Sequence, residues 1–346
     1  MRRLVLVILS CSLNVVVCAQ QTISVPVIVE GDQSALPLKD SDLKVEVNHQ
    51  PVTVSSLTPL AGQHLLYALI NGERRNTLWP KGSAQQIGVA GQLLKEVITA
   101  GVDIGSLVNF SDEYFLDVRD QKDPQQLAAK LAGDRSGAAM YDAVLATADY
   151  LAGKPDVPGY RKVMFLFCDG EDNLSVLERH PATERLQREG IPLFIFAPSA
   201  VTKKRQGKNL SRLALELGGR IYFLPESKTV SFDAVKQDLA RSFLLKISIP
   251  QPQAMETLNV ADSSQPKVSI VAPLQIGAPL RHRVQPAYTQ GQLADLRAKC
   301  EPYTNTKLED LESKRVALPP HECVQVLGWM RDSRVERLYV SEKPAQ

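Results

Sequence analysis

The sequence predicts an α/β protein with a doubly wound, mostly parallel sheet, helices on both faces, added N-terminal β strands and a C-terminal extension. Continuous apolar runs of the buried-strand type recur at 64–70 (HLLYALI), 162–168 (KVMFLFC) and 191–197 (IPLFIFA). Segments with apolar residues at helical spacing separate these runs. Apolar strands that alternate with amphipathic helices are typical of a parallel sheet covered on both faces.

The other elements of the central region follow from the same periodicities. Helices are expected over 83–100, 124–132, 140–151, 181–189, 210–217 and 232–243, and strands over 106–110, 114–118 and 220–224. Before this region, β-branched alternation predicts strands at 22–29, 43–47 and 51–54, as a small sheet of their own or an edge of the main one.

The C-terminal third differs in composition from the central region. Strands over 245–249 and 267–271 are expected to pair across a polar linker, and the later chain is polar, with short helices at 293–298 and 308–313 and a strand at 337–340. The predicted organisation is a signal peptide (1–19), an N-terminal β segment (20–60), an α/β domain (61–243), a β strand pair (244–272) and a polar C-terminal extension (273–346).

The N-terminus indicates export, to a secreted or periplasmic location. Arg2 and Arg3 precede a mostly apolar stretch over 4–17, and Val17-Cys18-Ala19 fits signal-peptidase cleavage after Ala19. A retained anchor is the alternative, although the stretch is shorter than the roughly 20 residues that a spanning helix needs. A lipoprotein is a further reading, but Val17 is too bulky for a typical lipobox. No stable membrane insertion is expected after signal removal.

Charge and cysteine usage narrow the classes of partner and the expected state of the cysteines. The chain has 40 basic and 38 acidic residues, a net charge of about +2, so nucleic acid and anionic membrane are not expected partners. Cys168 ends an apolar run and is expected to be a buried free thiol. In an oxidising compartment Cys300 and Cys323 could form a disulfide that supports a weak core, although the sequence does not show that the two sulfurs meet.

Three segments are expected to meet where parallel strands end, because ligands bind outside the carboxyl ends of such strands. They are 71–75 (NGERR), 136–142 (SGAAMYD) and 168–173 (CDGEDN). In this order and spacing they resemble the von Willebrand factor type A (VWA) family, closest to the exported bacterial VWFA-related subgroup first noted in acidobacteria. The resemblance covers roughly 23–271 and includes VNFS at 108–111, MYDA at 140–143, DGEDN at 169–173 and LAxxLGGR at 213–220.

The resemblance implies a Mg²⁺ site made of a DxSxS loop, a threonine and an aspartate, and this sequence departs from it. The first aspartate corresponds to Asn71, the two serines to Glu73 and Arg75, and the threonine to Ala138, so only Asp169 keeps its type. We therefore expect no cofactor. A rebuilt Mg²⁺ site of Asn71, Glu73 and Asp169 is the alternative.

The hypothesis we favour is that the Arg75 cation replaces the metal and pairs with Asp169 or Glu73, so that Arg75→Ser destabilises the domain. The same residues also have plainer readings. Asp169-Gly170 is a common turn pair, Asp142 suits a helix N-terminus, and Glu171 with Asp172 reads as a solvated turn. The basic run 203–205 with Lys208 reads as solvated surface.

Nothing in the sequence favours catalysis. The five histidines (His49, His64, His180, His282, His321) are scattered and fit no zinc spacing. GxSxG, Gly-rich phosphate loops and CxxC pairs are missing. The expected function is a metal-independent protein-binding module, which uses the loops at the carboxyl end of the sheet or the appended strands. A structural component of the bacterial envelope and an enzyme with an unrecognised site are the alternatives.

Overall fold

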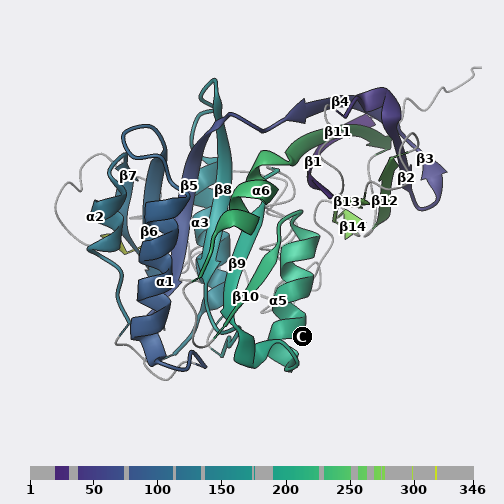
Figure 1. Ribbon diagram of the computed structural model, residues 1–346. Helices are drawn as coiled ribbons and strands as arrows, with labels where there is room; N and C mark the ends of the chain where they lie inside the picture. The colour runs from purple at the N-terminus through teal and green to yellow at the C-terminus, as the bar shows by residue number, and fades with distance from the viewer. Residues whose placement is uncertain are drawn as a thin grey trace, which may run out of the picture.

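An α/β body and a smaller β domain make up the part of the chain that the structure describes (Figure 1). The computed structural model describes residues 20–30, 38–73, 78–111, 114–133, 137–173, 175, 190–225, 230–250, 256–262, 269–273, 275–276, 298 and 316–317. The predicted signal peptide, Arg75, Cys300 and Cys323, the predicted helix at 181–189 and the predicted strand at 337–340 lie outside these ranges.

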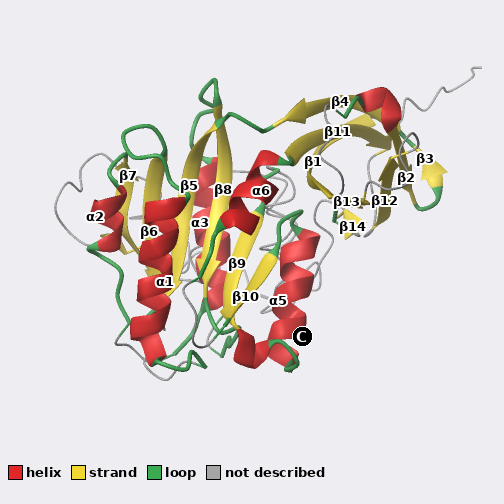
Figure 2. Ribbon diagram, in the orientation of Figure 1, coloured by secondary structure: helices red, strands yellow, loops and turns green. Residues whose placement is uncertain are grey.

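The body is built on one mixed, mostly parallel sheet with the strand order β10-β9-β8-β5-β6-β7-β15 (Figure 2). Its strands are β5 (His64–Gly72), β6 (Ile104–Phe110), β7 (Tyr114–Gln121), β8 (Tyr160–Phe167), β9 (Leu193–Pro198), β10 (Ile221–Leu224) and β15 (Val316–Ala317). β5, β6, β8, β9 and β10 pair in parallel, whereas β7 is antiparallel to both β6 and β15. The predicted doubly wound fold is confirmed.

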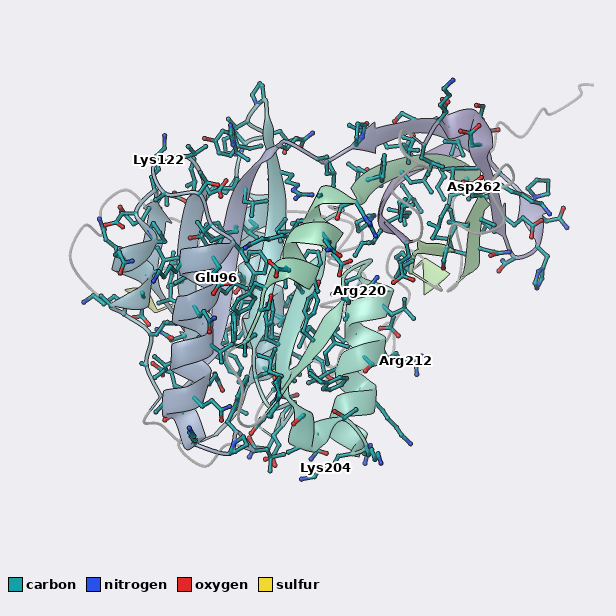
Figure 3. All side chains as sticks on the ribbon, viewed as in Figure 1. Glu96, Lys122, Lys204, Arg212, Arg220 and Asp262 are labelled. Carbon is teal, nitrogen blue, oxygen red and sulfur yellow. The ribbon has the colours of Figure 1, made fainter. Side chains whose placement is uncertain are left out.

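The amino and carboxyl ends of the parallel strands form two opposite sides of the sheet, called here its amino edge and its carboxyl edge. Lys122 follows the antiparallel strand β7 and marks the amino ends of the parallel strands, and Lys204, just before α5, marks their carboxyl ends (Figure 3). The helices are α1 (Gly82–Glu96), α2 (Pro124–Ala128), α3 (Met140–Ala152), α5 (Arg205–Glu216) and α6 (Asp233–Ala240), with a 3₁₀ turn η3 (Ser199–Val201). Among the described residues, no helix is both long and apolar enough to cross a membrane.

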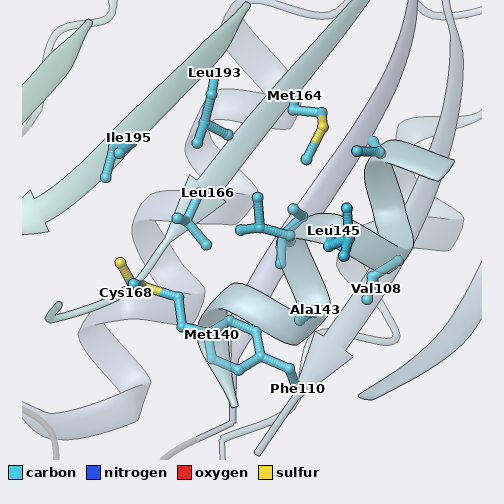
Figure 4. Packing of buried hydrophobic residues seen from close by; sticks show 14 of the residues in the cluster. Val108, Phe110, Met140, Ala143, Leu145, Met164, Leu166, Cys168, Leu193 and Ile195 are labelled. Carbon is cyan, nitrogen blue, oxygen red and sulfur yellow. The ribbon is translucent and has the colours of Figure 1, made fainter. Parts of the chain in front are cut away.

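A separate core lies on each face of the sheet, since successive residues of a strand point to opposite sides. On β5, Leu66, Ala68 and Ile70 join the core under α3 and α5, which Figure 4 shows from close by. The alternate residues Leu65, Tyr67 and Leu69 join the core under α1 and α6. This double burial explains why the strands read as unbroken apolar runs.

The β domain combines strands from before and after the body. They are β1 (Gln20–Glu30), β2 (Leu43–Val47), β3 (Gln50–Pro51), β4 (Thr53–Pro59), β11 (Ser242–Pro250), β12 (Glu256–Asp262), β13 (Ser269–Val271) and β14 (Gln275–Ile276), with a 3₁₀ turn η2 (Asp40–Asp42). Two sheets result, β13-β1-β11-β4 and β14-β12-β2-β3, which share a third apolar core. The body is therefore inserted between strands of one β domain.

This pairing corrects the expected β strand pair at 244–272. The strands at 245–249 and 267–271 do not pair with each other, because β1 lies between β11 and β13. Nine consecutive residues of β1 pair with β11, from Gln20↔Pro250 to Ile28↔Ser242. Pairing partners this far apart in the sequence leave no local signal, so alternation predicted the strands and not their neighbours.

Candidate functional site

The candidate site lies where the sheet changes winding direction. β5 leads through α1 to β6 on one side of it, and β8 leads to β9 on the other, so the carboxyl ends of β5 and β8 lie at the switch point of the strand order. The structure brings the three predicted segments together there. The Glu73 N–H donates to Phe110 O (2.7 Å), the Ala139 N–H to Ser111 O (2.7 Å) and the Asn173 N–H to Ala138 O (3.0 Å). Arg75 lies outside the described residues.

Asn71 is fully buried, and three side-chain hydrogen bonds hold its amide. Its Nδ2 donates to Asn109 Oδ1 and to Ala132 O, both at 2.8 Å, and its Oδ1 accepts from Gln86 Nε2 at 2.9 Å. Both amide hydrogens and the carbonyl oxygen thus have protein partners. Asn71 holds neighbouring loops together.

Gln86 is the second centre of this network. It comes from the first turns of α1, is only 2% exposed, and its Nε2 also lies 2.7 Å from Gly72 O and 3.2 Å from Phe167 O. Those two carbonyls end β5 and β8, so one amide joins the two central strands at the switch point. Sequence reasoning missed Gln86. The available signal was a polar residue at helical spacing from the buried Ala90 and Leu93.

Asn109 extends the network toward the neighbouring strand β7. Its Nδ2 donates to Asp117 Oδ2 at 2.6 Å and to Lys130 O at 2.9 Å, while its Oδ1 accepts the bond from Asn71. The asparagine is fully buried. Two asparagines and a glutamine therefore fill the carboxyl ends of β5 and β6 with hydrogen bonds inside the protein.

Asp169 braces its own loop and the loop after β5. One carboxylate oxygen accepts from the Leu78 N–H at 3.0 Å and the other from the Glu171 N–H at 3.1 Å. The second bond closes a local turn of the kind that aspartate favours. The predicted turn-forming reading of Asp169 matches this geometry. Both oxygens of the carboxylate are already used as acceptors.

The loop after β8 caps the start of α3. Around Ala138, the Asn173 side chain accepts from the Ala138 N–H at 2.9 Å, and Asp172 Oδ1 accepts from the Met140 N–H at 3.0 Å. Ser175 Oγ accepts from the Tyr141 N–H at 3.0 Å and donates to Asp172 Oδ1 at 2.6 Å. The bonds to Met140 and Tyr141 satisfy helix N–H groups that have no partner within the helix, and the bond to Ala138 holds the segment that leads into it.

Asp172 thus caps α3, which belongs to another segment of the chain. The prediction that it lies in a solvated turn was wrong. It is part-buried, and burial raises the pKa of its carboxyl group against the lowering effect of its bonds to Ser175 and Met140. Asp142 lies in the first turn of α3 as expected, with a fully buried side chain. Acidic groups gather here because the helix N-terminus favours them.

Cys168 directly follows β8 and belongs to the apolar core under α3 and α5. It is a buried free thiol, as the apolar run predicted, and burial raises its pKa above the ordinary value for a cysteine. Nucleophilic cysteines need the opposite, a lowered pKa in a partly open setting. The thiol belongs to the apolar core.

The described side chains do not fit the Mg²⁺ site that the family resemblance implies. Mg²⁺ needs near-octahedral oxygen ligands at about 2.0–2.1 Å. Asn71 Oδ1 is held by Gln86, the two Asp169 oxygens accept main-chain N–H groups, and Ala138 has no side-chain oxygen. Glu73 brings a fully buried carboxylate. Across the described ranges, no three His, Cys, Asp or Glu side chains form a group that could hold a metal ion.

Comparisons with known proteins give structural similarities only. No family model and no curated protein matches the chain. The chain is similar to BatB, a conserved hypothetical protein from Bacteroides thetaiotaomicron (13% identity, TM-score 0.38), over 51% of this chain and 97% of that one. It is similar to proximal thread matrix protein 1 of the mussel byssus, solved with a zinc-occupied MIDAS motif (14%, 0.41), over 56% of this chain and 49% of that one. The vWF domain of the pilus tip protein Mfa5 from Porphyromonas gingivalis matches at 12% and 0.25, over 32% and 40%.

Proposed function

We propose that this chain is an exported, VWA-like protein-binding module that contacts its partner through the loops at the carboxyl ends of β5, β6 and β8 without a metal ion. The N-terminal pattern of two arginines, an apolar stretch and Val17-Cys18-Ala19 supports export. Three of the VWA-like motifs, at 108–111, 140–143 and 169–173, lie in or beside those loops, at the switch point where α/β sheets bind ligands. Because three joined loops form this surface, we expect its ligand to be a protein.

The observation that carries metal independence is the hydrogen bonding of Asn71. In a metal site the side chain at this position would turn an oxygen toward the ion, with its donors directed elsewhere. Here the Oδ1 accepts from Gln86, and Nδ2 donates to Asn109 and Ala132 O. Rebuilding a ligand would break a buried network, and an unsatisfied buried group costs roughly 1–3 kcal/mol.

A binding role is also preferred to a catalytic one. The buried Cys168 thiol has a raised pKa and is unsuited to nucleophilic attack. In the part of the chain that the structure describes, a cavity of about 670 Å³ lies between β10 and α6, and its lining includes Arg220, Tyr222 and Asp238. None of its lining residues belongs to the loops after β5 or β8. This cavity therefore lies apart from the loops of the proposed binding surface.

Two measurements test the proposal. The first is calorimetric titration of the purified protein with Mg²⁺ and Mn²⁺, with melting followed in parallel. We expect no heat of binding and no shift in melting temperature. Binding that Asp169→Ala abolishes would overturn metal independence, because Asp169 is the one ligand type that the sequence keeps.

The second measurement is capture of partners from an envelope extract on immobilised protein, with and without a chelator, followed by reconstitution with the purified partner. Lys81→Glu changes an exposed residue at the start of α1, on the carboxyl edge, and Lys122→Glu is the matched change on the opposite edge. We expect the chelator and Lys122→Glu to leave binding intact and Lys81→Glu to weaken it. Loss of the partner with the chelator, or equal effects of the two variants, contradicts the proposal.

A further inference from the structure

The first turn of α5 and the turn before it carry an exposed basic surface. It consists of Lys203, Lys204, Arg205 and Lys208, all of which are exposed. From Pro198 to Leu215 the chain has five basic residues and no acidic one, although the whole chain is nearly balanced at 40 basic and 38 acidic residues. None of the four cations forms an ion pair with another described residue. The excess charge is local.

These charges do not help α5 to fold. Cations are unfavourable at a helix N-terminus, where the backbone already presents positive partial charge. The Lys204 side chain makes no capping hydrogen bond, and the first turn contains no acidic residue. Farther along the same helix, Arg212 pairs with Glu216 in the ordinary i,i+4 manner. A local rule broken only at the start of the helix points to a role outside folding.

The basic surface adjoins the candidate site. α5 follows β9, so its first turn lies at the carboxyl edge of the sheet, where Figure 3 shows Lys204. Gly170, in the loop after β8, packs against this turn so closely that a Cβ would lie 2.8 Å from Leu210 Cδ1 and 3.0 Å from Gln206 Cβ. The surface therefore continues from the loop that carries Asp169.

We propose that Lys203, Lys204, Arg205 and Lys208 form a docking surface for an acidic segment of the protein partner. This inference rests on the proposed function and names the chemistry of its partner: clustered carboxylates that meet four solvated cations and the positive end of α5. Complementary charge of this kind raises the rate of encounter and selects the partner.

Two features favour an acidic protein segment over other polyanions. Single-stranded nucleic acids are bound where aromatic side chains alternate with cations, and 198–216 contains no Phe, Tyr or Trp. Membrane-binding helices insert an apolar face beside their basic residues. The apolar residues of α5, including Leu210, Leu213 and Ala214, are buried in the core and are unavailable to a bilayer.

The test uses a fluorescent oligoglutamate peptide titrated against the full chain. Fluorescence anisotropy should report binding that weakens as salt rises from about 50 to about 300 mM, because exposed charges are screened. Lys204→Glu/Arg205→Glu should weaken binding by about tenfold or more. Lys122→Glu/Lys246→Glu gives the same change of net charge at exposed positions outside α5 and should leave binding within about twofold of wild type.

Folding of the first variant is checked by its melting temperature, which should not fall, since acidic residues suit a helix N-terminus. Absence of peptide binding to the wild type, or equal weakening by both double variants, overturns the inference. So does tighter binding of single-stranded DNA or of phosphatidylserine vesicles than of the peptide. A captured partner that binds Lys204→Glu/Arg205→Glu as well as wild type refutes this surface alone, whereas wild-type capture that depends on metal refutes the proposed function.

Discussion

At the scale of single residues, Asn71 shows why an amide stands where the family resemblance implies a carboxylate. Its two N–H groups point at oxygen atoms of Asn109 and Ala132, and its oxygen points at the Gln86 amide. A carboxylate supplies acceptors only. In a site with no exposure to solvent, the surrounding oxygens thus select asparagine.

The first prediction follows from this complementarity. Asn71→Asp should lower the free energy of unfolding by about 3 kcal/mol, because it removes two donors and buries a charge facing two acceptors. Urea unfolding measures the loss. Asn48→Asp, in an exposed turn with φ of 50°, is the matched control and should cost much less, because its new charge faces solvent. A loss no larger than that of the control would show that the Asn71 network contributes nothing to stability.

Asp172 gives the second prediction, which concerns pH. Burial raises the pKa of its carboxyl group above the usual 3.8, so the folded protein holds this proton more tightly than the unfolded chain. Its contribution to stability is therefore complete below about pH 3.8 and is lost as pH rises through the raised pKa. Asp172→Asn keeps an accepting oxygen and does not titrate.

The melting temperature of Asp172→Asn relative to wild type should therefore increase between about pH 3 and about pH 7. Thermal melts of both proteins across this range give the difference directly. Parallel melting curves across the whole range would mean that the carboxyl group titrates alike in the folded and unfolded states.

At the scale of elements, the sequence could predict which loops lie near one another but not the hydrogen bonds that join them. Parallel strands that end at one edge placed Asn71, Glu73, Ala138 and Asp169 near one another before any contact was visible. The bonds that join the loops involve polar side chains: Ser175 carries no periodic signal, and the helical spacing of Gln86 indicates a buried face without showing which atoms it bonds. The start of α5 was expected at Leu210 because its first turn, from Arg205, is polar and shows no apolar repeat.

The cap of α3 supports the third prediction. Ser175→Ala should destabilise the protein by about 1–2 kcal/mol, since it removes the acceptor of the Tyr141 and Asp142 N–H groups. Chemical denaturation measures this loss. The control is Ser41→Ala, whose hydroxyl donates to Asp42 at the exposed surface. Equal stability of the two variants would mean that the loop after β8 does not secure the helix.

At the scale of the whole molecule, the body is inserted into the β domain, so the stability of the two parts depends on the contact between them. β1 pairs with β11 and also meets the body, since Ile28 joins the core under α1 and α6. Arg220, which precedes β10, forms ion pairs with Glu30 of β1 and Asp238 of α6. The sequence could not predict this contact, because it joins residues nearly 200 positions apart (Arg220 and Glu30 differ by 190).

Gly218 provides the last prediction, which tests that contact. Its φ is +63°, and a Cβ there would lie 2.2 Å from the Pro26 carbonyl oxygen on β1. Gly62 has a φ of +75° and nothing within 4 Å of its Cβ position, so Gly62→Ala reproduces the backbone strain without the clash. Both variants should lose about 1–2 kcal/mol from the left-handed backbone conformation.

Gly218→Ala should lose at least about 2 kcal/mol more than Gly62→Ala, because the clash forces β1 away from the body and disturbs packing on both sides. Calorimetry should then show a broader transition for Gly218→Ala, as the β domain and the body cease to unfold together. Equal losses in the two variants would mean that β1 yields at no cost and that the inserted body is stable without it.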